Sequence, residues 1–482
     1  MHKLKAVAMI ASFSLFAGQA FALVNGQDAS AVFGQLDLSG APSFTQDTTH
    51  LNNWGMNLPN ESAVDTVNHR LYVADGDNHR VLVYNLDTNN EFTDFIADKV
   101  LGQPDFTSGG PATTQSGMQR PNSVLFDPVR NHLYVACTRR LLVYDVAEIT
   151  NGENAINVLG QVDFTSSAFG TTSTNFLNVV QGLALDTARG YLFVGDETNN
   201  RVLVFDINTL TNGEAAIRVL GQPNFTSSAP ALTASGFWTS SLKLDYDPVR
   251  KHLFAADSTA NRVLVFDVAT LTNGESAVHV LGQSNFTSDG QGAGAGGLFG
   301  PGGVAYDALG KDLYVADFGN NRVMVFDLET ITDGEDAVNV LGVPDFSTVQ
   351  PFSATRSTFR GAWDVVIDSW TNRLYVTDYD ANRVLVFDLR SFVGPDSVRA
   401  YPNPFRPGRG HSNVAISQLP SNATVKIYTL RGQLVRSLQA GAAGAVGWDG
   451  RNEEGEAVAS GVYYGVAEGN GDTKTFKVVV QR

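Results

Sequence analysis

The amino-acid sequence predicts an all-β protein, in which a six-bladed β-propeller is followed by a small β-sandwich. Three observations carry this prediction. The segment DFGNNRVMVFD at 317–327 returns along the chain in near-copies, and the Arg in it recurs every 60 or 61 residues. From about residue 397 the repeat gives way to a Pro/Gly-rich stretch and short alternating runs. Charged residues make up only 17% of the chain, which argues against long solvated helices or disorder.

The first 22 residues predict a secretory signal peptide. Lys3 and Lys5 precede an apolar run from Ala6 to Gly18, and Ala20-Phe21-Ala22 is a cleavage site of the A-x-A type. The run is too short to span about 30 Å of hydrocarbon, so a membrane anchor is the weaker interpretation. We therefore expect export, Leu23 as the new N-terminus, and no transmembrane segment.

Each repeat unit predicts four antiparallel strands. In the fifth unit these are the apolar runs 302–307, 312–317, 322–327 and 337–342, separated by turns rich in Asp, Asn and Gly. Six such units form a ring of six blades. The Arg residues that mark the units are Arg80, Arg140, Arg201, Arg262, Arg322 and Arg383.

The sixth unit lacks its fourth strand. The VLGQ-type motif that carries this strand occurs in the other units and is missing after residue 388, but a copy, AVFGQLDL, stands at 31–38. We expect this N-terminal strand to complete the last blade, close the ring and pair an otherwise open edge.

The repeated polar residues favour a structural role. An Asp that ends a strand accepts backbone N–H groups of the next turn, an Asn adopts the left-handed conformation of a tight turn, and an Arg pairs with a carboxylate. The repeated Asp residues are Asp75, Asp196, Asp257, Asp317 and Asp378, and the second unit has Cys137 instead. The alternative is that these carboxylates ring the channel and hold Ca²⁺.

The motif VADxxNNRVxVFD resembles the NHL-repeat family of propellers, over about residues 60–390. The final segment contains YPNPF, VKIYTLRGQLVRSL and WDGRNEEGEAVASGVYYGVAE, in this order. It resembles the C-terminal sorting domains of type IX secretion substrates and the Ig-like domain of flagellar hook-capping proteins. After the predicted signal peptide at 1–22, these resemblances imply a propeller at 23–396 and an Ig-like β-sandwich at 397–482. They also imply a protein secreted from, or held at the surface of, a Gram-negative bacterium, with secretion machinery as a partner of 397–482.

The charge distribution excludes nucleic acid as a partner. Residues 23–398 carry a net charge of −22 and residues 399–482 a net charge of +4. An acidic body of this size repels phosphate backbones.

No catalytic motif stands out, and no three of the eight His residues can be placed around the propeller axis. We therefore expect no metal or other cofactor, and a non-enzymatic protein that binds a glycan, peptide or protein. The alternative is a propeller enzyme, similar to lactonases or lyases, that acts on a small or carbohydrate substrate. The blade linkers and the turns between second and third strands should share one face, and the predicted ligand-binding residues there are Arg139, Trp238, Phe318, Asn320, Tyr379 and Asp380. Four linker residues should instead pack between blades, namely Phe176, Phe237, Phe299 and Phe359.

Overall fold

The structure is a computed structural model, and it describes residues 23–482 apart from short segments. The residues outside the description are 1–22, 89, 177–178, 309, 349–352, 369–370, 390–397, 403–404, 408–410, 418, 420–421, 430–432, 442–443 and 470–471. The predicted signal peptide and the predicted domain boundary near 396 therefore lie outside the described residues.

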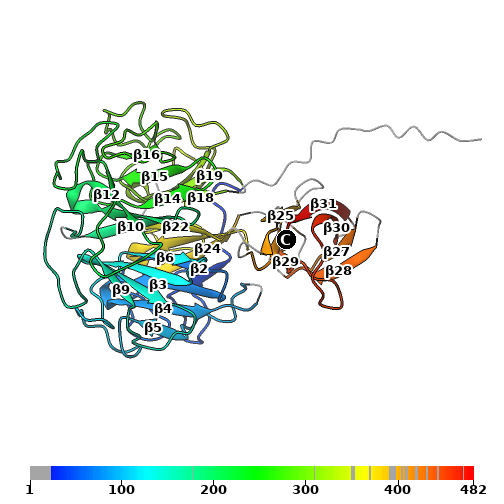
Figure 1. Ribbon diagram of the computed structural model, residues 1–482. Coiled ribbons are helices and arrows are strands. Elements are labelled where there is room, and N and C mark those ends of the chain that lie inside the picture. The colour runs from blue at the N-terminus through cyan, green and yellow to red at the C-terminus, as the bar shows by residue number, and fades with distance from the viewer. Residues whose placement is uncertain are drawn as a thin grey trace, which may run out of the picture.

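Six four-stranded antiparallel sheets form the six predicted blades (Figure 1). Blade one contains β2 (Pro59–Asp65), β3 (Arg70–Asp75), β4 (Arg80–Asn85) and β5 (Lys99–Leu101). Blade two contains β6 (Ser123–Asp127), β7 (His132–Cys137), β8 (Arg140–Asp145) and β9 (Asn157–Leu159). Blade three contains β10 (Val180–Asp186), β11 (Tyr191–Asp196), β12 (Arg201–Asp206) and β13 (Arg218–Leu220). Blade four contains β14 (Leu244–Asp247), β15 (His252–Asp257), β16 (Arg262–Asp267) and β17 (His279–Leu281). Blade five contains β18 (Pro301–Asp307), β19 (Asp312–Asp317), β20 (Arg322–Asp327) and β21 (Asn339–Leu341). Blade six contains β22 (Ala362–Asp368), β23 (Arg373–Asp378), β24 (Arg383–Asp388) and β1 (Ala31–Phe33).

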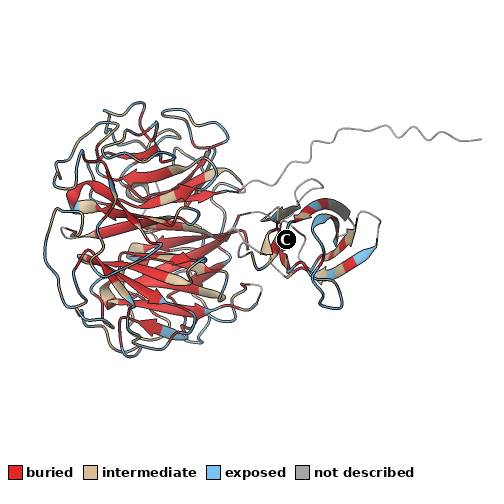
Figure 2. Ribbon diagram, viewed as in Figure 1, coloured by how far each residue is buried: buried red, intermediate tan, exposed pale blue. Residues whose placement is uncertain are grey.

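The first strand of each blade contacts the first strand of both neighbouring blades, and β2 contacts β22 as well as β6. These six innermost strands therefore surround one central channel. Both faces of each blade are apolar, because successive residues of the V-x-V-F run point to opposite sides of the sheet and are buried on both. The apolar cores therefore lie between adjacent blades (Figure 2).

The N-terminal segment supplies the fourth strand of blade six. Strand β1 pairs with β24 in antiparallel register, with Ala31 opposite Val386 and Phe33 opposite Val384. The loop before β1 also resembles the loop before the fourth strand of other blades. Asn25 Oδ1 in this loop accepts the backbone N–H of Val340 in blade five at 3.0 Å. Asn212 makes the equivalent bond to Val158 at 3.1 Å in the loop before β13. The pairing predicted for residues 31–38 is thus present over 31–33, and its contribution to stability stays a prediction.

Helical structure in the described part of the chain consists of four 3-10 turns between second and third strands. They are η1 (Gly76–Asn78), η2 (Glu197–Asn199), η3 (Phe318–Asn320) and η4 (Tyr379–Ala381). Each ends on a residue in the left-handed conformation, such as Asn200 at φ 50° and Asn382 at φ 54°, as the sequence predicts. Over the described residues, no helix has the length and apolar character needed to cross a membrane.

The C-terminal segment forms two sheets with a shared apolar core around Trp448. The three-stranded sheet contains β25 (Arg399–Tyr401), β26 (Val414–Ser417) and β29 (Val446–Trp448). The four-stranded sheet contains β27 (Thr424–Thr429), β28 (Leu434–Gln439), β30 (Gly461–Gly469) and β31 (Asp472–Val480). These seven strands form the small β-sandwich that the sequence predicts after about residue 397.

Candidate functional site: the loop face and the central channel

The repeated Asp and Arg residues form a buried ion pair inside five blades. In each, the Arg Nε donates to the Asp Oδ2 at 2.7 or 2.8 Å. In blades one, four, five and six the other Asp oxygen accepts a backbone N–H of the incoming linker, as Asp317 Oδ1 does from Phe299 at 2.7 Å. Burial raises the pKa of Asp257 to about 7 even though Arg262 opposes the shift. These carboxylates are thus committed to turns within their own blades, and the calcium ring stays an untested prediction.

Blade two departs from this arrangement. The thiol of Cys137 takes the position of the carboxylate, and burial raises its pKa to about 12. The Arg140 guanidinium is 2% exposed and donates to three backbone carbonyls, those of Phe164, Ala112 and Gly117. A buried guanidinium can therefore be held here by carbonyl oxygens instead of a carboxylate.

The blade linkers and the turns between second and third strands meet on one face, which we call the loop face. Backbone bonds join them within a blade, from Gly319 to Phe299 at 2.8 Å and from Tyr379 to Gly361 at 2.9 Å. Arg120, in the linker to blade two, donates to the Tyr379 hydroxyl of blade six at 2.7 Å. Loops from blades that are not neighbours thus converge at the mouth of the channel.

An aromatic cluster of Phe318, Trp363 and Tyr379 lies on the loop face between blades five and six. The rings of Phe318 and Trp363 are edge to face with centroids 5.0 Å apart, and those of Trp363 and Tyr379 lie 5.5 Å apart. Gly361 lies beneath the cluster, because a Cβ there would be 3.0 Å from both Phe318 Cε2 and Asp380 Oδ2. The buried indole N–H of Trp363 has no hydrogen-bond partner among the residues described. The structure therefore brings three predicted ligand-binding residues together with Trp363, which the sequence reasoning missed.

The other three predicted binding residues lie apart from this cluster. The Arg139 guanidinium stacks on the ring of Phe169 at 3.9 Å. The Trp238 side chain is 42% exposed in the linker to blade four. The Asn320 amide donates to Gly292 O and Asp317 Oδ2, both at 2.8 Å, so its N–H groups are used within the blade.

Three of the four linker Phe residues pack between blades, as predicted. Phe176, Phe237 and Phe359 are fully buried, but Phe299 is 36% exposed. The prediction for Phe299 is wrong because Leu298, which is fully buried, occupies that position in blade five.

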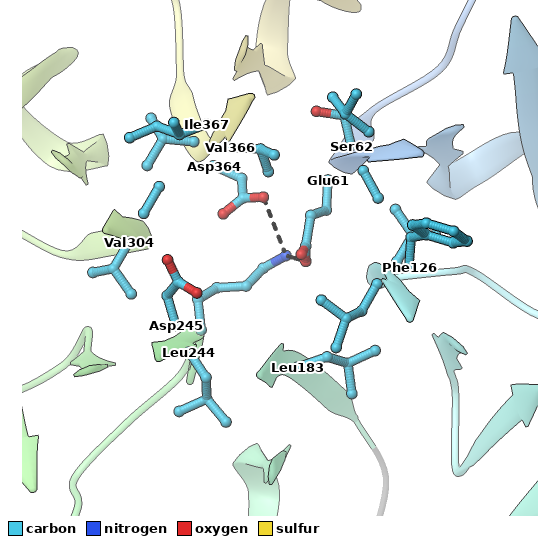
Figure 3. Close-up of a pocket in the computed structure, with 17 residues that line it drawn as sticks. Glu61, Ser62, Phe126, Leu183, Leu244, Asp245, Val304, Asp364, Val366 and Ile367 are labelled. Atoms are coloured by element: carbon cyan, nitrogen blue, oxygen red, sulfur yellow. Dashed lines mark hydrogen bonds and ion pairs between the residues drawn. The ribbon is translucent and has the colours of Figure 1, made fainter. Parts of the chain in front are cut away.

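A second gathering of polar side chains lies inside the central channel (Figure 3). Glu61, Ser123 and Asp364 occupy the same register position in their blades, opposite Ala74, Ala136 and Thr377 respectively. Lys243 holds this position in blade four, where its carbonyl accepts the N–H of Ala256 at 2.9 Å. The channel cluster comprises Glu61, Lys243, Asp245 and Asp364, which line a cavity of about 200 Å³.

Lys243 crosses the channel to the opposite blade. Its ammonium donates to Glu61 Oε2 at 2.5 Å and to the carbonyl of Asn122 at 2.8 Å. Asp364 Oδ2 lies 3.9 Å from the same ammonium and accepts no hydrogen bond within the described part of the chain. All three charged side chains are nearly buried.

The carboxyl groups of the cluster outnumber its one ammonium group. Burial raises the pKa of Asp245 to about 7, although its two oxygens accept the N–H groups of Tyr246 and Tyr306 at 2.8 and 2.6 Å. Burial also raises the pKa of Asp364 well above its usual range and raises that of Glu61, with Lys243 opposing both shifts. In the described ranges, no three His, Cys, Asp or Glu side chains are placed to hold one metal ion.

The sequence reasoning missed this cluster because its members do not repeat. Four residues before the Asp that ends each first strand, the sequence has Glu61, Ser123, Gly182, Lys243, Gly303 and Asp364. An alignment of the six repeat units contains the signal. It shows one position of the innermost strand at which polar residues vary from unit to unit.

Two family models match the chain. Residues 359–387 match the NHL repeat, and residues 406–472 match the FlgD Ig-like domain. The human protein "NHL repeat-containing protein 2" (Homo sapiens) is 27% identical over 366 residues, which cover 69% of this chain and 47% of the human protein. The chain thus spans about half the length of that curated relative.

Several solved structures are similar at low identity. A structural-genomics protein of unknown function from Bacteroides thetaiotaomicron has 15% identity and a TM-score of 0.45, over 71% of this chain and 73% of its own. An auxiliary nutrient binding protein from Bacteroides ovatus has 13% identity and a TM-score of 0.44, over 75% and 76%.

The repeat match lies in blade six, the Ig-like match covers most of the C-terminal sandwich, and the human relative carries the same repeat in its name. Together with the six blades and the C-terminal sandwich, these matches support an NHL-type β-propeller with a C-terminal Ig-like domain.

Proposed function

We propose that this protein is an exported, non-enzymatic binding protein whose loop face takes a glycan, peptide or protein ligand. The single observation that supports this most is the aromatic cluster of Phe318, Trp363 and Tyr379 beside Asp380. Aromatic rings with adjacent charged and amide groups suit the apolar faces and hydrogen-bonding edges of sugars and peptides.

The loop face also combines groups from separate blades. Arg120 bonds to Tyr379 and lies 3.3 Å from Asp77 Oδ1, so blades one, two and six contribute to one surface. A ligand that lies across this surface would contact side chains that differ from blade to blade, which allows selectivity without a catalytic group.

The test is a glycan array and a peptide array probed with purified residues 23–482. Tyr379→Ala and Phe318→Ala should each weaken binding to the best array ligand about 10-fold or more, because central aromatic contacts dominate binding energy. The matched control is Val249→Ala, a side chain that is 81% exposed in a turn at the opposite end of the strands. Equal binding by both aromatic variants and the wild-type protein, with unchanged melting temperatures, would contradict the proposal.

The second candidate function is a propeller enzyme acting on a small substrate, and the channel cluster favours it. A carboxyl with a pKa of about 7, such as that of Asp245, is suited to general acid–base catalysis near neutral pH. Hydrolysis of members of a lactone and ester panel that is lost in Asp245→Asn would establish this alternative in place of simple binding.

Export is part of the proposal, and it rests on the N-terminal pattern at 1–22 and on the likeness of 397–482 to sorting domains. We propose the cell surface or the surroundings of a Gram-negative bacterium as the location. The secretion machinery is then a partner of the C-terminal domain.

A further inference from the structure

The channel cavity contains a buried carboxylate oxygen that lacks a hydrogen-bond donor. Asp364 is 3% exposed, and its Oδ2 accepts no hydrogen bond from any described residue. Figure 3 shows the Asp364 side chain directed into the cavity, with Glu61 and Asp245 directed into it from other strands. The Asp364 side chain fits beside blade five because residue 303 is Gly. A Cβ at that position would lie 1.7 Å from Asp364 Oδ1.

The only cation of the channel cluster is already engaged. The Lys243 ammonium has short contacts to Glu61 and to the Asn122 carbonyl, whereas its distance to Asp364 is 3.9 Å. One ammonium therefore faces three carboxyl groups around a single cavity. Burying an uncompensated carboxylate is costly, so the site is stabilised by an added proton or an added cation.

The remaining wall restricts which cation fits. Most other lining side chains are apolar, including Leu183, Val304 and Ile367. A metal ion prefers several oxygen ligands, and no described set of three carboxylates converges closely enough to supply them. The volume of about 200 Å³ has room for about six water molecules at roughly 30 Å³ each. That space suits a cationic head with a short carbon chain.

We propose that the central channel binds a small primary amine in its ammonium form, with Asp364 as the principal acceptor and the apolar wall around the carbon chain. This site is separate from the loop face. The ammonium group supplies the donors that Asp364 Oδ2 lacks, and it balances the charge that Lys243 leaves uncompensated.

The experiment is isothermal titration calorimetry of purified residues 23–482 with n-pentylamine at pH 8. At this pH an alkyl amine is protonated, so the ammonium form that donates to Asp364 Oδ2 is present. We expect saturable one-site binding by the wild-type protein and none of 1-pentanol, which has the same chain without the charge. Asp364→Asn should lower the affinity for pentylamine at least 10-fold.

Two further variants keep the test decisive. Asp289→Asn removes one carboxylate from an exposed loop and should leave the affinity within about twofold. Ala305→Leu enlarges a side chain at the cavity wall without changing the charge and should weaken binding at least 10-fold, which provides a second test if Asp364→Asn fails to fold. Absence of saturable binding by the wild-type protein overturns the proposal. So does equal competition by potassium ions, which would assign the site to an inorganic cation, or full affinity in a folded Asp364→Asn or Ala305→Leu protein.

Discussion

At the scale of single residues, a fully buried carboxylate and guanidinium hold the loop-face end of five blades. Arg322 donates to Asp317 and to carbonyls of the incoming linker, including that of Gly297 at 3.0 Å. Arg322→Ala should lower the free energy of unfolding by about 3–5 kcal/mol, because Asp317 is left buried without its partner. Chemical denaturation measures this, and array binding per folded molecule should change much less.

Blade two offers a matched control for this prediction. Arg140 is equally buried but donates to carbonyl oxygens rather than to a carboxylate. Arg140→Ala should therefore cost less than Arg322→Ala, since no buried charge is left behind. If Arg322→Ala abolished ligand binding at an unchanged melting temperature, the repeated pair would be functional and the structural interpretation wrong.

Asp245 should make stability depend on pH. Its pKa is about 7 in the folded protein and near 3.9 when unfolded, so the native state binds more protons between these values. Stability from this group is therefore present below about pH 4 and lost as pH rises through 7. The free energy of unfolding of the wild-type protein, minus that of Asp245→Asn, should fall by on the order of 1–3 kcal/mol between pH 4 and pH 8. Parallel pH curves for the two proteins would show that Asp245 titrates normally.

At the scale of elements, strand β1 is the part of blade six that comes from the other end of the chain. It contributes Val32 and Phe33, both fully buried, and pairs three residues of β24. Deleting residues 23–40 should cost several kcal/mol, because strand pairing and apolar burial are both lost. Thermal unfolding of residues 23–482 and 41–482 measures the difference, and equal melting temperatures would refute the role of β1 in closing the ring.

The propeller strands could be predicted from the sequence, because nearly the same apolar run recurs in each of the six units. The position of β1 could also be predicted, since its VFGQ motif copies the fourth strand of the other blades. Residues 23–27, LVNGQ, also match LTNGE at 210–214, in the loop before β13. The role of this match is seen only in the structure, where Asn25 accepts the backbone N–H of Val340.

The channel cluster could not be predicted in this way. Its side chains come from blades one, four and six, and the spacing between Glu61, Lys243 and Asp364 gives no local pattern. Contacts across a ring depend on the number of blades and on which face of the innermost strand turns inward. The loop-face cluster was predicted in part, because Phe318 and Tyr379 lie in variable turns, whereas Trp363 lies inside strand β22 and looks like a core residue.

At the scale of the whole molecule, two units with separate apolar cores follow each other in the chain. The last propeller strand ends at Asp388 and the first sandwich strand begins at Arg399. The two parts differ in charge, at −22 for residues 23–398 and +4 for residues 399–482. Separately folded units are what we expect if the C-terminal domain directs the protein to its location. The opposite charges would instead favour docking of this domain on the propeller.

If residues 397–482 are a sorting domain, their deletion should change where the protein accumulates in a host with a type IX secretion system. The propeller keeps its own core, so the truncated protein should fold, with a melting temperature within a few degrees of that of the full chain. It should then accumulate in the periplasm, whereas the full chain should reach the cell surface or the medium. Cell fractionation and immunoblotting measure this, and fusing 397–482 to a periplasmic reporter should send the reporter out of the cell. A folded truncated protein that still left the cell, with a reporter fusion that stayed inside, would identify the C-terminal domain as an Ig-like accessory module without a sorting role.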